Sequence, residues 1–412
     1  MPTVREPRLT AVQDAIDSFA TGGLVVVSDG EDRENEADLV MAAQFATAES
    51  VGFIVRHTGG IVCVPMGASR AGSLDLPAMV DANTDLHKTA FTVSVDHVSA
   101  STGISAKDRA VTIQALADTQ VEAASFRRPG HVFPLVARPG GVLKRAGHTE
   151  AAVDLARLAG TREVGVISEL VTDTGEPMRP DEARRFSMAH GLPYLTIEDL
   201  QRFRRTNESL IDRGGTATLP TERAVFQAQA YRSRLDGTEH LALTLGQVAW
   251  CDDKRPVLVR VHSECLTGDV LGSQRCDCGS QLALSMQLIA DAGRGVIVYL
   301  RGQEGRGIGL SHKLEAYALQ ELGRDTVDAN LDLGLPVDSR DYGIGAQILA
   351  DLGVRRIRLL TNNPAKYTGL AGYDLEISER VPLRAAPLPS NVNYMATKQR
   401  RLGHDLGLPL GG

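Results

Sequence analysis

Three cysteines in the second half of the chain lie close enough in sequence to bind one metal ion. Cys265, Cys276 and Cys278 fall within fourteen residues. Thiolate sulfur is a preferred ligand of zinc, and three protein ligands leave a coordination position in which water becomes a nucleophile near neutral pH. A fourth ligand such as His262 would instead close the site and make the zinc structural, and a third interpretation is a group of unreactive buried thiols. The pattern favours a catalytic zinc site.

Two segments that follow strand-like runs carry residues suited to phosphate. Residues 301–309 (RGQEGRGIG) combine two arginines with four glycines, which allow close backbone approach to a polyphosphate. Residues 361–366 (TNNPAK) place a hydroxyl and an ammonium after another strand, where α/β sheets collect ligands. An ordinary strand-to-helix turn would also explain the glycines. Asp338 and Arg340, taken in isolation, suit a solvated ion pair.

The first half of the chain contains a second group of possible metal and phosphate ligands. Residues 31–38 (EDRENEAD) hold five carboxylates, which suit Mg²⁺, and an arginine that could hold a phosphate. Residues 145–150 (RAGHTE) precede a predicted helix with Thr149 as its expected N-cap, where free N–H groups bind phosphate. His148 could be a metal ligand or a base. A solvated charged turn and a histidine without a ligand are the alternative interpretations.

The elements that must position these residues alternate between strands and helices in both halves, which predicts an α+β or α/β fold. We expect helices over 10–20, 150–158, 197–203, 312–322 and 342–352. We expect strands over 24–27, 60–65, 90–96, 257–261, 295–300 and 357–360. The polar segment 204–215 predicts a boundary between domains 1–206 and 207–412, and the last fifteen residues are expected to form a loosely attached tail.

Composition excludes several classes of protein. The chain has 412 residues, 43% of them hydrophobic, which is enough for two or three domain cores. A net charge of −7 argues against general nucleic-acid affinity. No apolar run reaches the ~18–20 residues of a membrane span, and the N-terminus lacks the apolar stretch of a signal peptide. Five cysteines make a disulfide framework improbable, and Cys63 and Cys251 are expected to be buried thiols. We therefore expect a cytoplasmic enzyme or binding protein without nucleic-acid or membrane partners.

The second half resembles GTP cyclohydrolase II over about residues 215–405. The motifs are RVHSECLTGD (260–269), RCDC (275–278), QEGR (303–306), DTVDAN (325–330) and LLTNNP (359–364). The resemblance implies Zn²⁺ on the three cysteines, Arg340 as nucleophile on the α-phosphate and Asp338 as proton acceptor. It also implies these GTP contacts: Arg260, Val261, His262, Ser263, Glu264, Gln281, Glu304, Gly305, Arg306, Tyr317, Thr326, Thr361 and Lys366.

The implied reaction opens the imidazole ring of guanine and cuts the triphosphate. Zinc would activate the water that attacks C8, and Mg²⁺ with cationic side chains would bear the charge of the phosphates. The implied products are formate, diphosphate and 2,5-diamino-6-(5-phosphoribosylamino)pyrimidin-4-one.

The first half resembles 3,4-dihydroxy-2-butanone-4-phosphate synthase over about residues 8–206. The motifs are the acidic loop, RPGHVFPL (128–135) and GHTEA (147–151). The resemblance implies Mg²⁺ or Mn²⁺ on Glu34 and His148, with His131 and Glu169 in catalysis. It also implies these contacts to ribulose 5-phosphate: Arg33, Glu34, Asp38, Arg145, Ala146, Gly147, His148, Thr149 and Glu169. The products would be 3,4-dihydroxy-2-butanone 4-phosphate and formate.

Three departures from the synthase pattern leave the activity of the first half open. Gly30 replaces an aspartate, Ala37 replaces a glycine whose backbone freedom it lacks, and Lys88 stands where glycine is common. The leading hypothesis is a bifunctional enzyme that supplies both precursors of riboflavin. One alternative is GTP cyclohydrolase II alone, with a silent first domain as a dimerisation scaffold. Another is a zinc-stabilised nucleotide sensor without turnover. The resemblance implies a homodimer with synthase sites built from both subunits.

Overall fold

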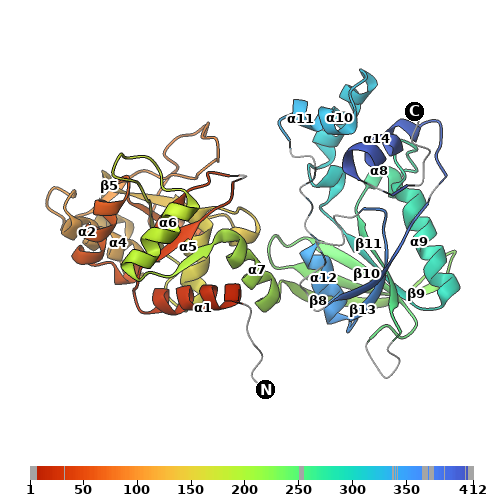
Figure 1. Cartoon of the computed structure of the whole chain (residues 1–412), viewed down its shortest axis with the longest axis horizontal. Coiled ribbons are helices and arrows are strands. Elements are labelled where there is room, and N and C mark those ends of the chain that lie inside the picture. The colour runs from red at the N-terminus through yellow and green to blue at the C-terminus, as the bar shows by residue number, and fades with distance from the viewer. Residues whose placement is uncertain are drawn as a thin grey trace. The chain divides into compact units, whose positions relative to one another are not determined.

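The computed structural model describes residues 7–406 apart from 32, 250–254, 336–337, 339, 341, 364–369, 371–374, 385 and 404, and only the backbone of 7–10, 393 and 402. Cys251 therefore lies outside the described residues. The chain divides into two compact units, Met1–Asn207 and Glu208–Gly412, and each is built around its own seven-stranded sheet (Figure 1). None of the described helices is long and apolar enough to span a membrane.

The first unit is a mixed sheet with helices on both faces. Its strands are β1 (Val25–Ser28), β2 (Ala37–Ala42), β3 (Cys63–Met66), β4 (Val95–His97), β5 (Phe126–Val136), β6 (Gly165–Glu169) and β7 (Tyr194–Thr196). Its helices are α1 (Pro7–Ala20), α2 (Ala48–His57), α3 (Ala68–Ser73), α4 (Ala106–Ala117), α5 (His148–Leu158), α6 (Pro180–His190) and α7 (Ile197–Asn207), with 3₁₀ turns at Ala43–Phe45, Ala123–Ser125 and Gly141–Leu143. The strand order is β4-β5-β3-β6-β2-β1-β7.

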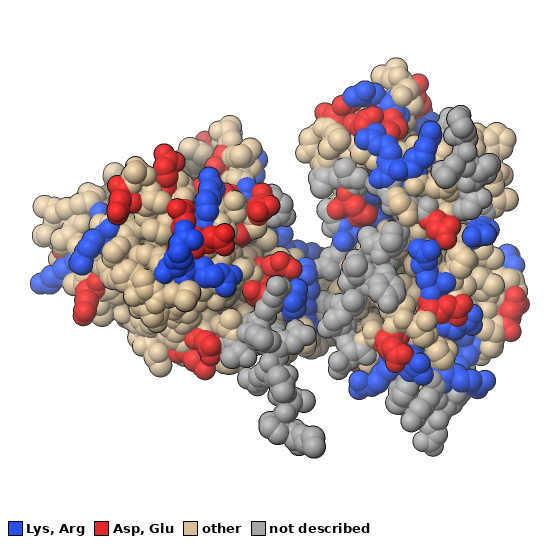
Figure 2. Space-filling view, viewed as in Figure 1, with Lys and Arg blue, Asp and Glu red and all other residues tan. Residues whose placement is uncertain are grey.

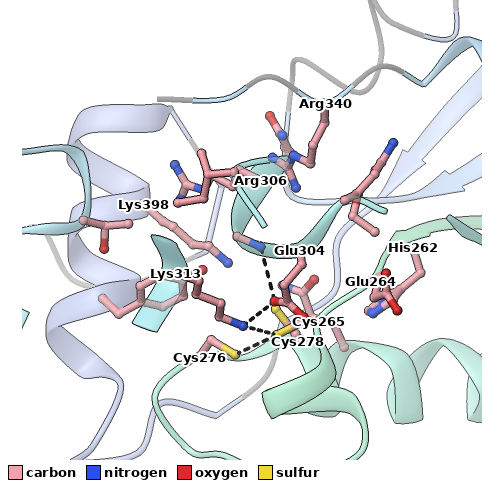
Figure 3. Close-up of a pocket in the computed structure, with 18 of the residues that line it drawn as sticks. His262, Glu264, Cys265, Cys276, Cys278, Glu304, Arg306, Lys313, Arg340 and Lys398 are labelled. Carbon is pink, nitrogen blue, oxygen red and sulfur yellow. Dashed lines mark hydrogen bonds and ion pairs between the residues drawn. The ribbon is translucent and has the colours of Figure 1, made fainter. Parts of the chain in front are cut away.

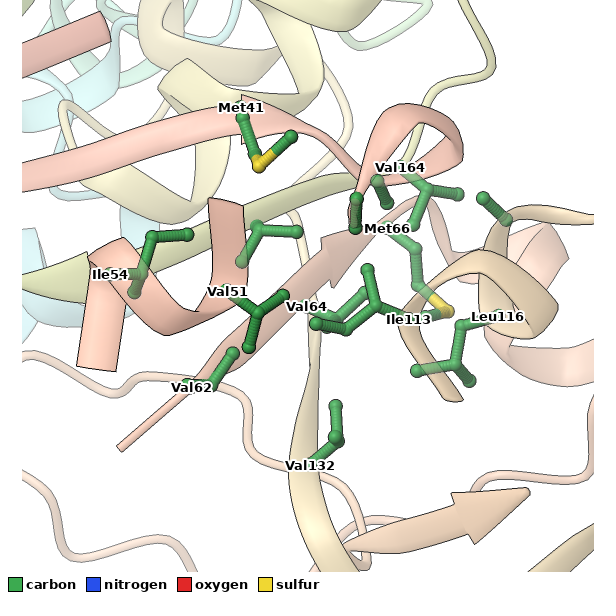
Figure 4. Packing of buried hydrophobic residues seen from close by; sticks show 14 of the residues in the cluster. Met41, Val51, Ile54, Val62, Val64, Met66, Ile113, Leu116, Val132 and Val164 are labelled. Carbon is green, nitrogen blue, oxygen red and sulfur yellow. The ribbon is translucent and has the colours of Figure 1, made fainter. Parts of the chain in front are cut away.

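Alternate residues of the central strands feed two hydrophobic clusters. Along β2, Leu39 and Met41 join the cluster that packs against α2 and α4 (Figure 4), while Val40 and Ala42 join the cluster under α1 and α5. Both β1 and β2 are buried along their whole length. The acidic loop, which spans 29–36 between the two strands, connects β1 with β2, so its ends are fixed by the core.

The second unit is also mixed. Its strands are β8 (Ile211–Pro220), β9 (Val225–Ser233), β10 (Glu239–Leu245), β11 (Val257–Ser263), β12 (Gly295–Leu300), β13 (Arg356–Leu360) and β14 (Glu376–Val381). Its helices are α8 (Leu266–Asp269), α9 (Cys278–Ala292), α10 (Leu310–Glu321), α11 (Thr326–Asp332), α12 (Gly343–Asp351) and α14 (Val392–Leu402), with a 3₁₀ turn at Glu304–Arg306. The strand order is β14-β13-β11-β12-β10-β9-β8.

Three parallel strands bring distant segments to one edge of this sheet. β11 pairs in parallel with both β12 and β13, so the carboxyl ends of the three strands meet. Residues 264–278, 301–309 and 361–363 leave the sheet at that edge. The cysteines, the glycine-rich loop and the TNN segment, which are far apart in sequence, are therefore neighbours in space.

The predicted two-domain, mixed α/β class is confirmed, and each predicted helix coincides with an observed one. The predictions 312–322 and 342–352 extend one residue beyond the observed ends of α10 and α12. Two element predictions are wrong. Only Val95–His97 of the expected strand 90–96 is regular, because Phe91 and Thr92 make isolated bridges to different segments. The last fifteen residues do not begin as a loose tail: 398–402 continue α14, and the Lys398 side chain is buried in an ion pair.

Candidate active sites

The three cysteines converge on one point in the second unit. Cys265 follows β11, and Cys276 and Cys278 lie at the start of α9 (Figure 3). The Sγ atoms of Cys265 and Cys276 are 3.7 Å apart, and the sulfurs of all three lie within 4.8 Å of one another. A disulfide would need about 2.05 Å, whereas this spacing suits thiolates around a single zinc ion.

Gly268 leaves room for an ion between the thiols. A Cβ at this position would lie 2.9 Å from the Cys276 sulfur, 3.1 Å from the Cys265 sulfur and 3.2 Å from the Cys278 Cβ. Real Cβ atoms essentially never show the first of these distances, so a larger residue here would have to displace the Cys276 sulfur. The residues present therefore fit a zinc ion.

His262 does not complete the ligand set. Its Nε2 lies 3.0 Å from the Asp269 carboxylate, and its Nδ1 lies 3.3 Å from the Arg260 guanidinium. Among the described residues of the second unit, the group of possible metal ligands consists of the three cysteines. The geometry favours the open, three-ligand interpretation over a closed structural site.

Lys313 on α10 is a neighbour of the thiols that the sequence analysis missed. Its Nζ donates to the Cys265 sulfur at 3.2 Å, to Thr267 Oγ1 at 2.8 Å and to Glu304 at 2.5 Å. Hydrogen bonds from the other two cysteines, and then the charge of Lys313, lower the pKa of the Cys265 thiol. In sequence, Lys313 looks like any surface lysine of an amphipathic helix, and only its burial shows otherwise.

Replacing Gly268 with alanine tests the space between the sulfurs. We expect Gly268→Ala to weaken zinc binding by about 10–100-fold, as changes beside ligands commonly do, because the new methyl group would displace the Cys276 sulfur. Zinc affinity is measured by competition with a chromophoric chelator. Gly215→Ala is the matched control, since a Cβ at Gly215 meets nothing within 4 Å. Equal affinity in both variants would contradict the assignment.

The thiols open into a pocket at the edge where β11, β12 and β13 end (Figure 3). Most residues predicted to contact GTP line it: Arg260, His262, Ser263, Glu264, Gln281, Glu304, Gly305, Arg306, Tyr317, Thr326 and Thr361. Val261 does not, because its side chain points to the opposite face of β11 and is buried in the core. Lys366 lies outside the described residues.

Cationic side chains are concentrated in this pocket. Arg260, Arg306, Lys313, Arg340 and Lys398 all line it. Burial lowers the pKa of Arg260 to about 10, which still leaves the guanidinium charged at neutral pH. Several buried cations around one cavity are the arrangement that a polyphosphate requires.

Asp338 and Arg340 form an ion pair at the pocket wall. The Arg340 Nε donates to Asp338 at 2.8 Å, and a second guanidinium nitrogen donates to the other carboxylate oxygen. The Arg340 side chain is 13% exposed and the Asp338 side chain 33%, so the pair is partly buried on the side of the arginine rather than fully solvated. Although burial opposes it, Asp338 keeps the pKa of Arg340 raised. Arg340 lines the pocket, and Asp338 binds the Arg340 guanidinium without being part of the pocket lining.

The first unit has a separate cluster of carboxylates and a histidine. Ligand atoms of Asp29, Glu34 and His148 lie within 4.8 Å of one another. Asp29 follows β1 and organises the acidic loop, since it accepts hydrogen bonds from Arg33 and from the backbone N–H groups of Glu34 and Glu36. Asp29 lies just before the acidic segment 31–38, so the sequence pattern missed this role.

His148 lies at the centre of this cluster. Its Nδ1 is 3.7 Å from Glu34 and 3.8 Å from Asp38, and both the His148 Nε2 and the Asp38 Oδ1 are buried without a hydrogen-bond partner among the described residues. Burial lowers the pKa of His148, but Asp38 and Glu34 outweigh burial and raise the pKa to about 9. Burial raises the pKa of Asp38 to about 7. An imidazole with a pKa of about 9 is protonated when no metal is bound, so a bound cation would displace a proton from it. The Asp38 Oδ1, buried without a partner among the described residues, is an oxygen that such a cation would satisfy.

The other predicted synthase residues are placed around β2, β5 and α5. Glu169 ends β6 directly opposite Asp38. The His131 Nδ1 is 2.7 Å from Asp96, which also accepts the His131 backbone N–H. Arg145 pairs with Glu150 at 2.7 Å.

The start of α5 differs from the prediction. Arg145, Ala146 and Gly147 lead into α5, whose N-cap is Gly147, so the prediction of Thr149 as N-cap is wrong. The helix begins two residues earlier because His148 and Thr149 are already helical and buried.

The departures from the family pattern have local explanations. Ala37 lies in β2 with its side chain in the core and without a positive φ, so it causes no backbone strain. Gly30 is exposed, and its carbonyl accepts hydrogen bonds from Arg33 and Asn35 within the loop. Lys88 has a φ of 53°, the left-handed conformation that favours glycine. Lys88 is therefore the one departure with a conformational cost.

The fold and its two sites define a two-domain α/β enzyme with one cluster of thiols and one cluster of carboxylates with a histidine. A family model described as 3,4-dihydroxy-2-butanone 4-phosphate synthase matches residues 13–203, and one described as GTP cyclohydrolase II matches residues 212–382. The chain belongs to the bifunctional riboflavin biosynthesis proteins, which join these two domains. Their substrates are small molecules.

Relatives support this membership over nearly the whole chain. The riboflavin biosynthesis protein RibBA of Salinispora arenicola is 56% identical over 394 residues, 95% of this chain and 93% of the relative. The bifunctional riboflavin biosynthesis protein RIBA 1, chloroplastic, of Arabidopsis thaliana is 55% identical over 409 residues, 98% of this chain and 75% of the relative. The crystal structure of RibBX of A. baumannii, a two domain 3,4-dihydroxy-2-butanone 4-phosphate synthase, superposes with a TM-score of 0.68 at 35% identity, covering 90% of this chain and 98% of that one. RibBX is a synthase with two domains, so the two-domain architecture by itself does not imply a second activity.

Proposed function

We propose that residues 1–206 convert ribulose 5-phosphate to 3,4-dihydroxy-2-butanone 4-phosphate and formate, and that residues 207–412 hydrolyse GTP. The GTP products are formate, diphosphate and 2,5-diamino-6-(5-phosphoribosylamino)pyrimidin-4-one. The observation that carries the second assignment is the cluster of three thiols, with space beside Gly268, at the wall of a cation-lined pocket. Because the three thiols and the cationic side chains line the same cavity, the site suits a nucleoside triphosphate whose base lies near the metal.

The side chains of the pocket divide the work on GTP. Cys265, Cys276 and Cys278 would hold Zn²⁺, which would supply a Lewis acid that makes water reactive toward C8 of guanine. Arg260 and Arg306 bear phosphate charge, together with a Mg²⁺ ion that accompanies the nucleotide. Lys313 offsets the negative charge of the Cys265 thiolate, which it contacts at 3.2 Å.

Arg340 is proposed as the nucleophile on the α-phosphate and Asp338 as its proton acceptor. The Asp338 carboxylate is hydrogen-bonded to two guanidinium nitrogens, so it is placed to receive a proton. Because the same ion pair raises the pKa of Arg340, the free guanidinium is protonated. Attack by a guanidinium nitrogen would form an N–P bond, break the bond from the α-phosphorus to its bridging oxygen so that diphosphate leaves, and pass a proton to Asp338. Water would then cleave the N–P bond, and Asp338 would return the proton to the Arg340 guanidinium.

In the first unit, Glu34 and His148 are proposed to hold Mg²⁺ or Mn²⁺. One imidazole with carboxylate oxygens suits such an ion, which would supply a positive charge beside the oxygens of the sugar when bound. Arg33, Asp38, Arg145–Thr149 and Glu169 bind the sugar phosphate. The hydrogen bond from His131 to Asp96 fixes the orientation of that imidazole for proton transfer. The complete donor set favours an active first domain over a silent scaffold.

The remaining proposals concern partners and location. We propose a homodimer, with synthase sites that both subunits build, and a cytoplasmic location, since free thiols persist in a reducing compartment. On the face shown in Figure 2, acidic and basic side chains are interspersed on both units, which does not suit nucleic acid.

Two separate formate assays test the proposed function. Purified protein with Zn²⁺ and Mg²⁺ is expected to release formate from GTP and, independently, from ribulose 5-phosphate. Formate from GTP alone would support the scaffold alternative for the first domain. Formate from neither substrate would overturn both assignments and leave a nucleotide-binding protein.

A further inference from the structure

The C-terminal helix α14 contributes to the GTP pocket although it lies beyond the matched family region. The GTP cyclohydrolase II match ends at residue 382, and α14 spans Val392–Leu402. Tyr394 and Lys398 of this helix nevertheless line the pocket, and Figure 3 shows the Lys398 side chain reaching from α14 toward the thiols. The helix therefore forms one wall of the site.

Lys398 is buried against the loop that carries two of the cysteines. Its side chain is 9% exposed, and its Nζ lies 2.7 Å from the Asp277 Oδ1. Asp277, between Cys276 and Cys278 in sequence, is 1% exposed. A buried ammonium and a buried carboxylate are each costly alone, so each requires the other.

Asp277 is also connected through hydrogen bonds to two of the predicted nucleotide-binding residues. Its second carboxylate oxygen accepts a hydrogen bond from the Gln281 Nε2 at 2.6 Å, and the Gln281 Oε1 accepts one from Arg260 at 2.8 Å. Arg260 also donates to the Leu360 carbonyl at the end of β13 at 3.0 Å. A continuous network thus connects α14 with the cysteine loop and with strands β11 and β13.

Further contacts dock α14 in this position. Arg401 donates to Asp325 at 2.6 Å and to Asp328 at 2.7 Å, both at the start of α11. The Asp405 backbone N–H donates to the Asn362 carbonyl at the pocket edge. Met395 is 1% exposed. The helix is therefore held from the outside by ion pairs and from the inside by burial.

We propose that α14 is part of the cyclohydrolase site and that Lys398 is a positioning residue for the zinc-binding loop. The inference rests on the proposed function of the second unit. Three thiolates around one dication carry a net charge of −1, and the Asp277 carboxylate adds a second negative charge within the same loop. Lys398 offsets that charge and fixes the loop, so the Cys276 and Cys278 sulfurs keep the spacing that zinc requires.

The test variant is Lys398→Met in the full-length protein. We expect about 10–100-fold weaker zinc binding and a similar fall in kcat for GTP, the usual range for groups next to metal ligands, with KM for GTP little changed. Zinc affinity is measured by chelator competition without substrate, and formate release gives the kinetics. Formate release from ribulose 5-phosphate is expected to be unchanged, because the first unit is a separate compact body.

Two further variants separate positioning from simple loss of stability. Arg400→Met, an exposed cation on the same helix, is the matched control and is expected to behave as wild type. The double variant Lys398→Met/Asp277→Asn removes both charges and is expected to regain part of the zinc affinity lost in Lys398→Met, because no buried charge is left unpaired.

Three outcomes would overturn the inference. One is wild-type zinc affinity and kcat in Lys398→Met with only a lower melting temperature, which means a purely structural helix. Another is unchanged zinc affinity with a raised KM, which means a direct substrate contact. The third is equal loss in Lys398→Met and Arg400→Met. Failure of wild-type protein to release formate from GTP would instead refute the proposed function, while the zinc measurement would still decide the role of Lys398.

Discussion

Replacing Cys276 with serine is expected to lower the rate of formate release from GTP by at least about 100-fold. The expected loss exceeds the 10–100-fold typical of a group beside a metal ligand, because here a ligand itself is removed. A serine hydroxyl is not ionised at neutral pH and is a poor zinc ligand, so only two thiolates would remain. Formate release from ribulose 5-phosphate is expected to stay at the wild-type rate. Both rates are measured on the same preparation, together with zinc content.

The bifunctional chain supplies its own control for this variant. If both reactions fell equally in Cys276→Ser, zinc would be stabilising the whole protein rather than serving one site. Full activity on GTP after complete removal of zinc would exclude a catalytic role for zinc.

Replacing Glu34 with glutamine is expected to remove formate release from ribulose 5-phosphate, also by about 100-fold or more, because the carboxylate is a proposed metal ligand. Burial raises the pKa of Glu34, but the nearby His148 and Arg33 outweigh burial and lower that pKa to about 2. The side chain is therefore ionised at neutral pH, and glutamine removes a full negative charge without changing its size. Rates are measured over a titration of Mg²⁺, and the GTP reaction is expected to be unaffected.

Glu31→Gln is the matched control, because Glu31 is an exposed carboxylate of the same loop outside the Asp29, Glu34 and His148 cluster. Wild-type sugar turnover in Glu34→Gln, or an equal loss in Glu31→Gln, would refute the metal assignment in the first unit.

Local patterns predicted the parts of the fold that local physics decides. The helix at 10–20 and the strand at 295–300 were recognised because hydrophobic periodicity and flanking glycines act over a few residues. The antiparallel strands β8–β10 were missed. For β8 the reason is that it is exposed along nearly its whole length and carries no apolar alternation. The expected strand at 90–96 was wrong because its pairing depends on segments that are far away in sequence.

Residue type and spacing by themselves determined which donor atoms this chain has: three thiols near Cys265, and carboxylates with an imidazole in the first half. This is so because ligand preference is a property of the donor atom and needs no fold. Only the tertiary structure decided which charges lose their water. Asp29, Lys313 and Lys398 look like ordinary surface residues in the sequence, and their burial beside the two sites depends on strands and helices that pack together from distant segments. Desolvation makes these groups strong partners of a metal site, and desolvation is a consequence of packing.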